Sequence, residues 1–133
     1  MEVNPPSNRI SIVIIDDNPR SLEFLAAALS APEVEILTTS KPEDGLALIS
    51  LHRPQIVLTD LAMPGMSGLE ILQKTRQLDK GIRVIVMSAH ESGGSPDKAF
   101  EQGAADFLTK PIALSVLRQR VGAVIQKCLP DPH

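Results

Sequence analysis

The sequence predicts an α/β fold, a doubly wound sheet of five parallel strands with helices on both faces. Two observations carry this prediction. Five short apolar runs alternate with amphipathic segments along the chain. The runs are nearly continuous in Ile, Val and Leu, as expected of strands that are buried on both faces of a parallel sheet. At 133 residues the chain is long enough for one such domain with a real hydrophobic core.

The strands are predicted from the apolar runs themselves, which are short and end at polar or turn residues. They lie at 10–15, 33–37, 55–59, 82–87 and 105–108. The chain then divides into three parts. We expect a polar, proline-containing lead-in at 1–9, the domain at 10–128, and a tail or the start of a linker at 129–133.

The first three helices are indicated by apolar periodicity and by their starting residues. One face of the first helix has i, i+3, i+4 and i+7 spacing, formed by Leu22, Leu25, Ala26 and Leu29. Pro42 opens a second helix at about 42–51, which ends before Pro54. Ser67 and Glu70 form a capping-box pattern, which predicts the start of a third helix at about 67–78.

The last two helices differ in length. Pro96 follows a serine and precedes an aspartate, so a fourth helix should begin there and stop at Gly103. Two glycines at 93–94 oppose an earlier start, so we expect a mobile loop at 91–95 and a short helix. A fifth helix is expected at about 113–128. Its inner face is formed by Leu117, Val121, Val124, Ile125 and Cys128.

Composition excludes several classes of function. The net charge of −3 disfavours direct binding to nucleic acid or to an anionic membrane. The longest apolar runs are about five residues, far below the roughly 20 that a membrane span needs. The first residues lack the basic and apolar regions of a signal peptide. Cys128 is the only cysteine, which fits a reducing compartment, and we expect a cytoplasmic protein.

Charged and hydroxyl side chains stand at the ends of four predicted strands. They are Asp16, Asp17, Asp60, Ser88 and Lys110. Right-handed crossovers place the carboxyl ends of parallel strands at one edge of the sheet, so these side chains should converge. Carboxylates are suitable ligands for Mg²⁺. Three acids with one base therefore predict a pocket for a divalent metal and a phosphoryl group.

These residues and their order resemble the receiver domain of two-component response regulators, and the resemblance covers residues 9–128. The matching segments are Ile15-Asp16-Asp17, Thr59-Asp60-Leu61-Ala62-Met63-Pro64-Gly65-Met66-Ser67-Gly68, Met87-Ser88-Ala89 and Lys110-Pro111. The resemblance implies the flavodoxin-like receiver fold with strand order 2-1-3-4-5. It also implies a phosphorelay signalling protein that receives a phosphoryl group from a histidine kinase or a histidine phosphotransfer protein.

The resemblance further implies roles for single residues. Asp60 would accept the phosphoryl group. Mg²⁺, with Mn²⁺ as an alternative, would be held by Asp16, Asp17, Asp60 and the backbone carbonyl of Ala62. Lys110 and the Ser88 hydroxyl would then contact the phosphoryl oxygens.

Three further positions follow from the same resemblance. Phe107 would move inward on phosphorylation and reshape the surface of the fourth helix, fifth strand and fifth helix. Ala62 and His90 would line the path of the water that hydrolyses the aspartyl phosphate. The bond before Pro111 would be cis.

Formal charge explains why a cation is needed. Three carboxylates balance one ammonium group and one divalent cation. Without those cations, at least one carboxylate would take up a proton and Asp60 would be a poor nucleophile. The aspartyl phosphate is more negative than the carboxylate, so its charge-assisted hydrogen bonds can favour one conformer.

Simpler interpretations stay open for single residues. Asp16 and Asp17 could be an acid pair at a helix start, Asp60 a turn residue, and Phe107 a core residue. His90 could be an ordinary exposed histidine of a loop.

Whole-chain alternatives also remain. A pseudo-receiver would have the fold and serve only as an interaction surface. A flavodoxin-like cofactor site is disfavoured because Asp16 and Asp17 would repel a phosphate, and an aspartate-nucleophile phosphatase because Ala62 stands where a second acid is needed. We expect self-catalysed phosphoacceptance and autodephosphorylation only, not an enzyme. Output would come from a domain after residue 133 or a separate target, with the receiver monomeric or dimerising on phosphorylation.

Overall fold

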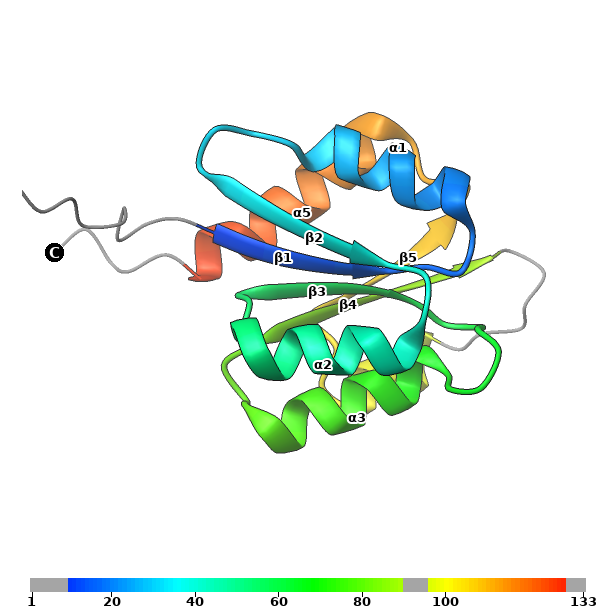
Figure 1. Ribbon diagram of the computed structural model, residues 1–133. Coiled ribbons are helices and arrows are strands. Elements are labelled where there is room, and N and C mark those ends of the chain that lie inside the picture. Colours follow the sequence, from blue (N-terminus) through cyan, green and yellow to red (C-terminus); the bar gives the residue numbers. More distant parts are fainter. Residues whose placement is uncertain (1–9, 90–95, 129–133) are drawn as a thin grey trace, which may run out of the picture.

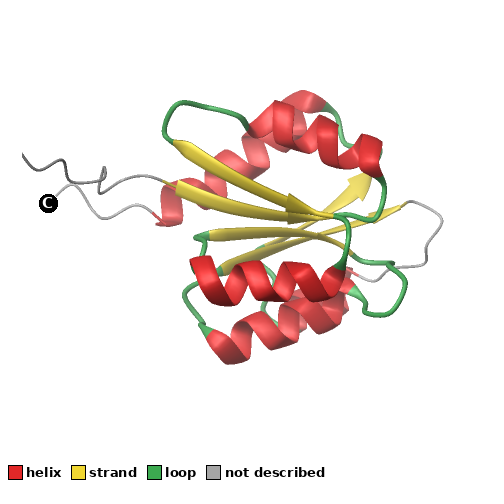
Figure 2. Cartoon of the chain, viewed as in Figure 1, coloured by secondary structure: helices red, strands yellow, loops and turns green. Residues whose placement is uncertain are grey.

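A computed structural model describes residues 10–89 and 96–128, and it is an alternating α/β structure (Figures 1 and 2). The strands are β1 Ile10–Ile15, β2 Val34–Thr39, β3 Ile56–Asp60, β4 Arg83–Ala89 and β5 Asp106–Lys110. The helices are α1 Pro19–Leu29, α2 Pro42–His52, α3 Gly68–Leu78, α4 Pro96–Glu101 and α5 Leu114–Cys128. Within these residues no helix is both long and apolar enough to span a bilayer.

The five strands form one parallel sheet in the order β2-β1-β3-β4-β5, as predicted. β1 is flanked by β2 and β3, so that Ile12 pairs with both Ile36 and Ile56. Helices α1 and α5 cover one face and the remaining helices cover the other (Figure 1). The chain order and right-handed crossovers therefore bring the carboxyl ends of β1, β3, β4 and β5 together at one edge.

Two hydrophobic clusters pack against the two faces of the sheet. Alternate residues of β1 point to opposite clusters: Ile12 and Ile14 to the α1–α5 side, Val13 and Ile15 to the other. The predicted inner face of α5 is confirmed, because its three buried residues Leu117, Val121 and Val124 lie in the first cluster. The sheet is thus fixed from both sides and provides a rigid base for its edge.

The predicted burial of every strand on both faces is wrong for β2. All of its residues are half-buried or exposed, whereas every residue of β3 is buried. The physical reason is position, since β2 is an edge strand with a neighbour on one side only. Several strands are also longer than predicted. Backbone pairing continues to Asp60, which pairs with Met87, and to Lys110, which pairs with Ala89. The polar residues Asp60 and Lys110 are therefore the last residues of β3 and β5.

The helix starts are largely those indicated by the sequence. Asn18 caps α1, and Ser67 and Glu70 form the reciprocal capping box of α3. Helix α4 has only six residues, in agreement with the prediction of a short helix. The predicted mobile loop at 91–95 lies outside the described residues.

The α3 cap can be tested by Ser67→Ala. Its side chain accepts a hydrogen bond from the Glu70 amide, and loss of such a cap costs about 1 kcal/mol of unfolding free energy. Urea unfolding should show this loss. The matched control is Ser50→Ala, which changes an exposed serine inside α2 and should leave stability unchanged or slightly higher. Equal stability of the two variants would contradict the capping role.

Candidate active site

The predicted charged residues gather at the carboxyl edge of the sheet. Asp16 and Asp17 directly follow β1, Asp60 ends β3 and Lys110 ends β5. β1, β3, β4 and β5 are consecutive in the sheet, so residues far apart in sequence meet here. The predicted convergence is therefore confirmed for these four residues.

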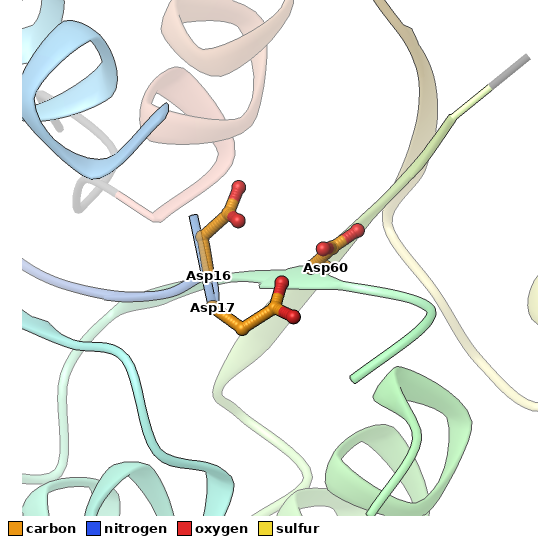
Figure 3. A group of neighbouring side chains, drawn as sticks. All are labelled: Asp16, Asp17 and Asp60. Carbon is orange, nitrogen blue, oxygen red and sulfur yellow. The ribbon is translucent and has the colours of Figure 1, made fainter. Parts of the chain in front are cut away.

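The three aspartates form a compact carboxylate cluster (Figure 3). One carboxylate oxygen from each of Asp16, Asp17 and Asp60 lies within 4.8 Å of the other two. Asp16 is fully buried and Asp60 is 8% exposed, whereas Asp17 is exposed to solvent. Hard oxygen donors that include one open to water fit Mg²⁺, which prefers such ligands and keeps several water molecules.

Lys110 supplies positive charge to this cluster. Its Nζ atom lies 2.6 Å from Oδ2 of Asp16 and 3.7 Å from Oδ2 of Asp60. The closer contact is a charge-assisted hydrogen bond to the buried aspartate. The ammonium group thus reaches both a predicted metal ligand and the predicted phosphoacceptor.

The protonation of Asp60 depends on this balance. Burial raises the pKa of the Asp60 carboxyl to about 6, Lys110 opposes the rise, and the nearby Asp16 and Asp17 add to it. A cation added to this cluster would lower the pKa of Asp60 and favour its ionised form, the form in which a carboxylate can act as a nucleophile.

The acid pair after β1 is not a helix cap. The side chain of Asn18 accepts hydrogen bonds from the backbone amides of Arg20 and Ser21, and no acid lies in the first turn of α1. Asp16 instead accepts from the amide of Asn18 at 3.0 Å, which fixes its carboxylate at the sheet edge. Of the two interpretations left open by the sequence, the structure therefore disfavours the helix-terminus one.

Ser88 lies on β4, one residue beyond the partner of Asp60. It is 3% exposed, and its hydroxyl donates to the carbonyl oxygen of Ala89 at 3.2 Å. In the β4–β5 register it stands opposite Thr109, next to Lys110. Its position at the same edge is consistent with the predicted contact to a phosphoryl oxygen.

Phe107 is a core residue in this conformation. It is 8% exposed and belongs to the hydrophobic cluster that contains Val86 of β4 and Ala99 of α4. The carboxylate of Asp106 accepts from the Phe107 amide at 2.8 Å, and Arg120 of α5 donates to the Phe107 carbonyl at 3.5 Å. Asp106 and Arg120 also form a bidentate pair at 2.6 Å. The backbone of Phe107 is thus fixed to α5 while its side chain faces α4.

The other predicted positions have mixed outcomes. The bond between Lys110 and Pro111 is cis, which confirms that prediction. Ala62 lies in the loop between β3 and α3 and is exposed, and a metal contact of its carbonyl stays a prediction. His90 lies outside the described residues.

One feature of the site was missed from the sequence. A hollow of about 470 Å³ borders Lys110, and it is lined by Phe24, Ala89, Pro111 and Ile112 among others. Phe24 is 42% exposed, and Leu114 extends the apolar surface nearby with the same exposed fraction. The available signal was Phe24 itself, a large apolar residue outside the buried stripe of α1.

Fold and site together define a parallel α/β domain with a cluster of aspartates and a lysine at the carboxyl edge of its sheet. The family model of the response regulator receiver domain matches residues 12–122. The chain belongs to this family.

Individual relatives agree with the family match. The heme response regulator HssR of Staphylococcus aureus (strain MRSA252) is 30% identical over 118 residues, which are 89% of this chain and 52% of HssR. The transcriptional regulatory protein GlrR of Escherichia coli (strain K12) is 27% identical over 119 residues, 90% of this chain and 27% of GlrR. The chain therefore spans about half or less of the length of these curated relatives.

Solved structures show the same fold. The receiver domain of a LuxO repressor protein from Vibrio parahaemolyticus has a TM-score of 0.83 at 26% identity, covering 90% of this chain and 92% of that one. A response regulator receiver domain from Clostridium thermocellum has a TM-score of 0.82 at 27% identity, with 89% and 95% coverage.

The raised pKa of Asp60 predicts the pH dependence of stability without metal. Between its ordinary value of 3.8 and about 6, the folded protein binds more protons than the unfolded chain, so stability falls as pH rises through this window. Asp60→Asn removes the cost of an ionised buried carboxylate. It should raise the unfolding free energy at pH 8 by up to about 3 kcal/mol and lose this advantage near pH 4.

Urea unfolding at the two pH values, in the presence of a chelator, measures this effect. Glu23→Gln is the matched control, because it also replaces a carboxylate with an amide, at an exposed position in the middle of α1. A stability gain for Asp60→Asn that is equal at both pH values would contradict the raised pKa.

Proposed function

We propose that this receiver domain accepts a phosphoryl group on Asp60 from a phosphohistidine of a partner kinase or histidine phosphotransfer protein, in a reaction that requires Mg²⁺. The observation that carries the proposal is the clustering of Asp16 and Asp17 with the phosphoacceptor Asp60, whose carboxylate lies 3.7 Å from the Lys110 ammonium group. Family membership supports it, because response regulators are the receiving partners of two-component systems.

The transfer itself is a displacement at phosphorus. One oxygen of the Asp60 carboxylate forms the new bond, the bond between phosphorus and the donor imidazole breaks, and its electron pair stays on the imidazole nitrogen. Mg²⁺, when bound by Asp16, Asp17, Asp60 and the Ala62 carbonyl, would neutralise charge on the carboxylates and the phosphoryl oxygens. Mn²⁺ could replace it.

Lys110 and Ser88 act on the product. The phosphoryl group adds negative charge at Asp60, so the ammonium group of Lys110 is drawn from Asp16 toward a phosphoryl oxygen. The Ser88 hydroxyl turns from the Ala89 carbonyl to donate to another oxygen. These new hydrogen bonds favour a conformer with a changed surface on α4, β5 and α5.

The output of the domain is the altered surface. Phe107 connects the site to this surface. It lies on β5, three positions before Lys110, and belongs to the same hydrophobic cluster as Ala99 of α4. The longer relatives favour an output domain after the receiver, and a separate target protein is the alternative. In this proposal the receiver is monomeric or dimerises on phosphorylation. It does not itself bind nucleic acid.

A pseudo-receiver is the second candidate. It would use the same fold as a fixed interaction surface and carry out no transfer. The complete set of Asp16, Asp17, Asp60, Ser88 and Lys110 favours the phosphoacceptor, because an interaction module needs none of them. We further propose that the domain acts only on its own aspartate, is not an enzyme, and resides in the cytoplasm with its kinase.

The apolar hollow beside Lys110 suits the protein donor. A histidine must approach Asp60 from outside the sheet edge, and the exposed Phe24 with Pro111 and Ile112 forms an apolar rim there. Arg118 donates to the Ala28 carbonyl at 3.1 Å, which links the carboxyl end of α1, the helix that carries Phe24, to α5. We assign this rim to the docking of the donor protein.

Labelling with a small acyl phosphate tests the proposed transfer. Incubation with acetyl phosphate and Mg²⁺ should add one phosphoryl group to the intact mass, and a chelator should prevent this addition. Asp60→Asn is the control and should stay unlabelled. Absence of labelling together with absence of Mg²⁺ binding by calorimetry would favour the pseudo-receiver.

Phe24→Ala tests the docking rim. With acetyl phosphate the variant should label at the wild-type rate, because a small donor needs no rim. With a purified autophosphorylated histidine kinase that phosphorylates the wild type, initial transfer at subsaturating receiver should fall about tenfold, the usual loss for a buried aromatic anchor worth 1–2 kcal/mol. The control is Phe100→Ala, which removes a similarly exposed aromatic side chain on α4. Equal losses for both variants would refute the assignment.

A further inference from the structure

Gly68 lies directly against the backbone of the phosphoacceptor. It is the first residue of α3, is fully buried, and donates its amide hydrogen to the carbonyl oxygen of Leu61 at 2.8 Å. Leu61 in turn donates to the Met87 carbonyl of β4 at 2.6 Å. The peptide that follows Asp60 is thus held between β4 on one side and the start of α3 on the other.

A side chain at position 68 would have no room. A Cβ atom built on Gly68 would overlap the carbonyl oxygen of Asp60, and would lie 2.9 Å from Cα of Leu61 and 3.0 Å from the carbonyl carbon of Asp60. All three are backbone atoms, which cannot rotate away as the end of a side chain can.

This environment distinguishes Gly68 from the other glycines in the described part of the chain. The atoms nearest to a Cβ atom at Gly45 or Gly103 would belong to the side chains of Ile15 and Arg76 respectively, and a Cβ atom at Gly122 would meet nothing within 4 Å. Only at Gly68 does the missing side chain allow contact with the backbone of a site residue.

Neither partner of this contact can yield easily. Helix α3 is anchored by the fully buried Ile71, Leu72 and Thr75. Asp60 is anchored by its pairing with Met87 in the sheet. A substitution at 68 must therefore displace the Asp60–Leu61 peptide, the start of α3, or both.

We propose that Gly68 is a positioning residue for phosphoryl transfer: its lack of a side chain sets the backbone of Asp60 and of the following loop at the depth where the carboxylate cluster can bind Mg²⁺. This inference rests on the proposed function. A shift of the peptide after Asp60 moves both its carboxylate and the Ala62 carbonyl, and Mg²⁺ tolerates little departure from octahedral geometry.

The test is Gly68→Ala in the full chain, measured by Mg²⁺ calorimetry and by acetyl phosphate labelling. We expect Mg²⁺ affinity to fall about tenfold or more, the loss typical of residues that orient metal ligands. The labelling rate at saturating donor should fall as well, while circular dichroism shows a folded protein. The matched controls are Gly122→Ala, the same change in open space, and Val124→Ala, a destabilising change in the core of α5. Both should keep wild-type Mg²⁺ affinity.

A stability defect of Gly68→Ala can be distinguished from a positioning defect by restoring the folded state before Mg²⁺ affinity is measured. If Gly68→Ala is partly unfolded, it and Val124→Ala are measured in trimethylamine N-oxide, which favours the compact state. Wild-type Mg²⁺ affinity in refolded Gly68→Ala, or an equal loss in Val124→Ala, would overturn the proposal. If the wild type itself neither binds Mg²⁺ nor labels, the proposed function fails instead.

Discussion

The crowding of three carboxylates at one sheet edge is the constraint on which the rest of the site depends. Two of these groups, Asp16 and Asp60, are withdrawn from water, and only Lys110 offsets their charge among the described residues. Such a cluster is costly for the folded protein, because ionised carboxylates repel each other more strongly when buried. Any added positive charge relieves this repulsion, so the cluster favours cations and would accept a negatively charged phosphoryl group only together with one.

The fold makes this crowding stable by distributing its anchors. The charged groups stand at the ends of three strands, β1, β3 and β5, and these strands are fixed by two hydrophobic clusters that lie on opposite faces of the sheet. Local contacts then fix the positions of the aspartates. The Asn18 amide donates to the Asp16 carboxylate, and the absence of a side chain at Gly68 allows α3 to pack against the backbone of Asp60. Packing of the two hydrophobic clusters therefore offsets the destabilising effect of the carboxylates at the edge of the sheet.

Much of this arrangement could be predicted because it follows from chain-local patterns. Apolar runs indicated the strands, and the rule for parallel crossovers brought Asp16, Asp60 and Lys110 together. Other features depend on contacts between distant residues. The half-buried state of β2 depends on sheet order, and the preference of Lys110 for Asp16 over Asp60 depends on side-chain geometry. The place of Phe24 outside the buried stripe of α1 signals its exposure, but the hollow that it lines with Pro111 and Ile112 depends on packing between segments far apart in the sequence.

The ion pair of Asp106 with Arg120 has a consequence for assembly. β5 is an edge strand, and edges with free backbone groups invite strand addition by other chains. Here the Phe107 amide and carbonyl are already bonded to Asp106 and Arg120. The edge is thereby closed to a β-strand partner at its centre. A partner that docks on this side would therefore meet side chains of α4, β5 and α5, because a strand cannot be added at Phe107 without breaking these two hydrogen bonds.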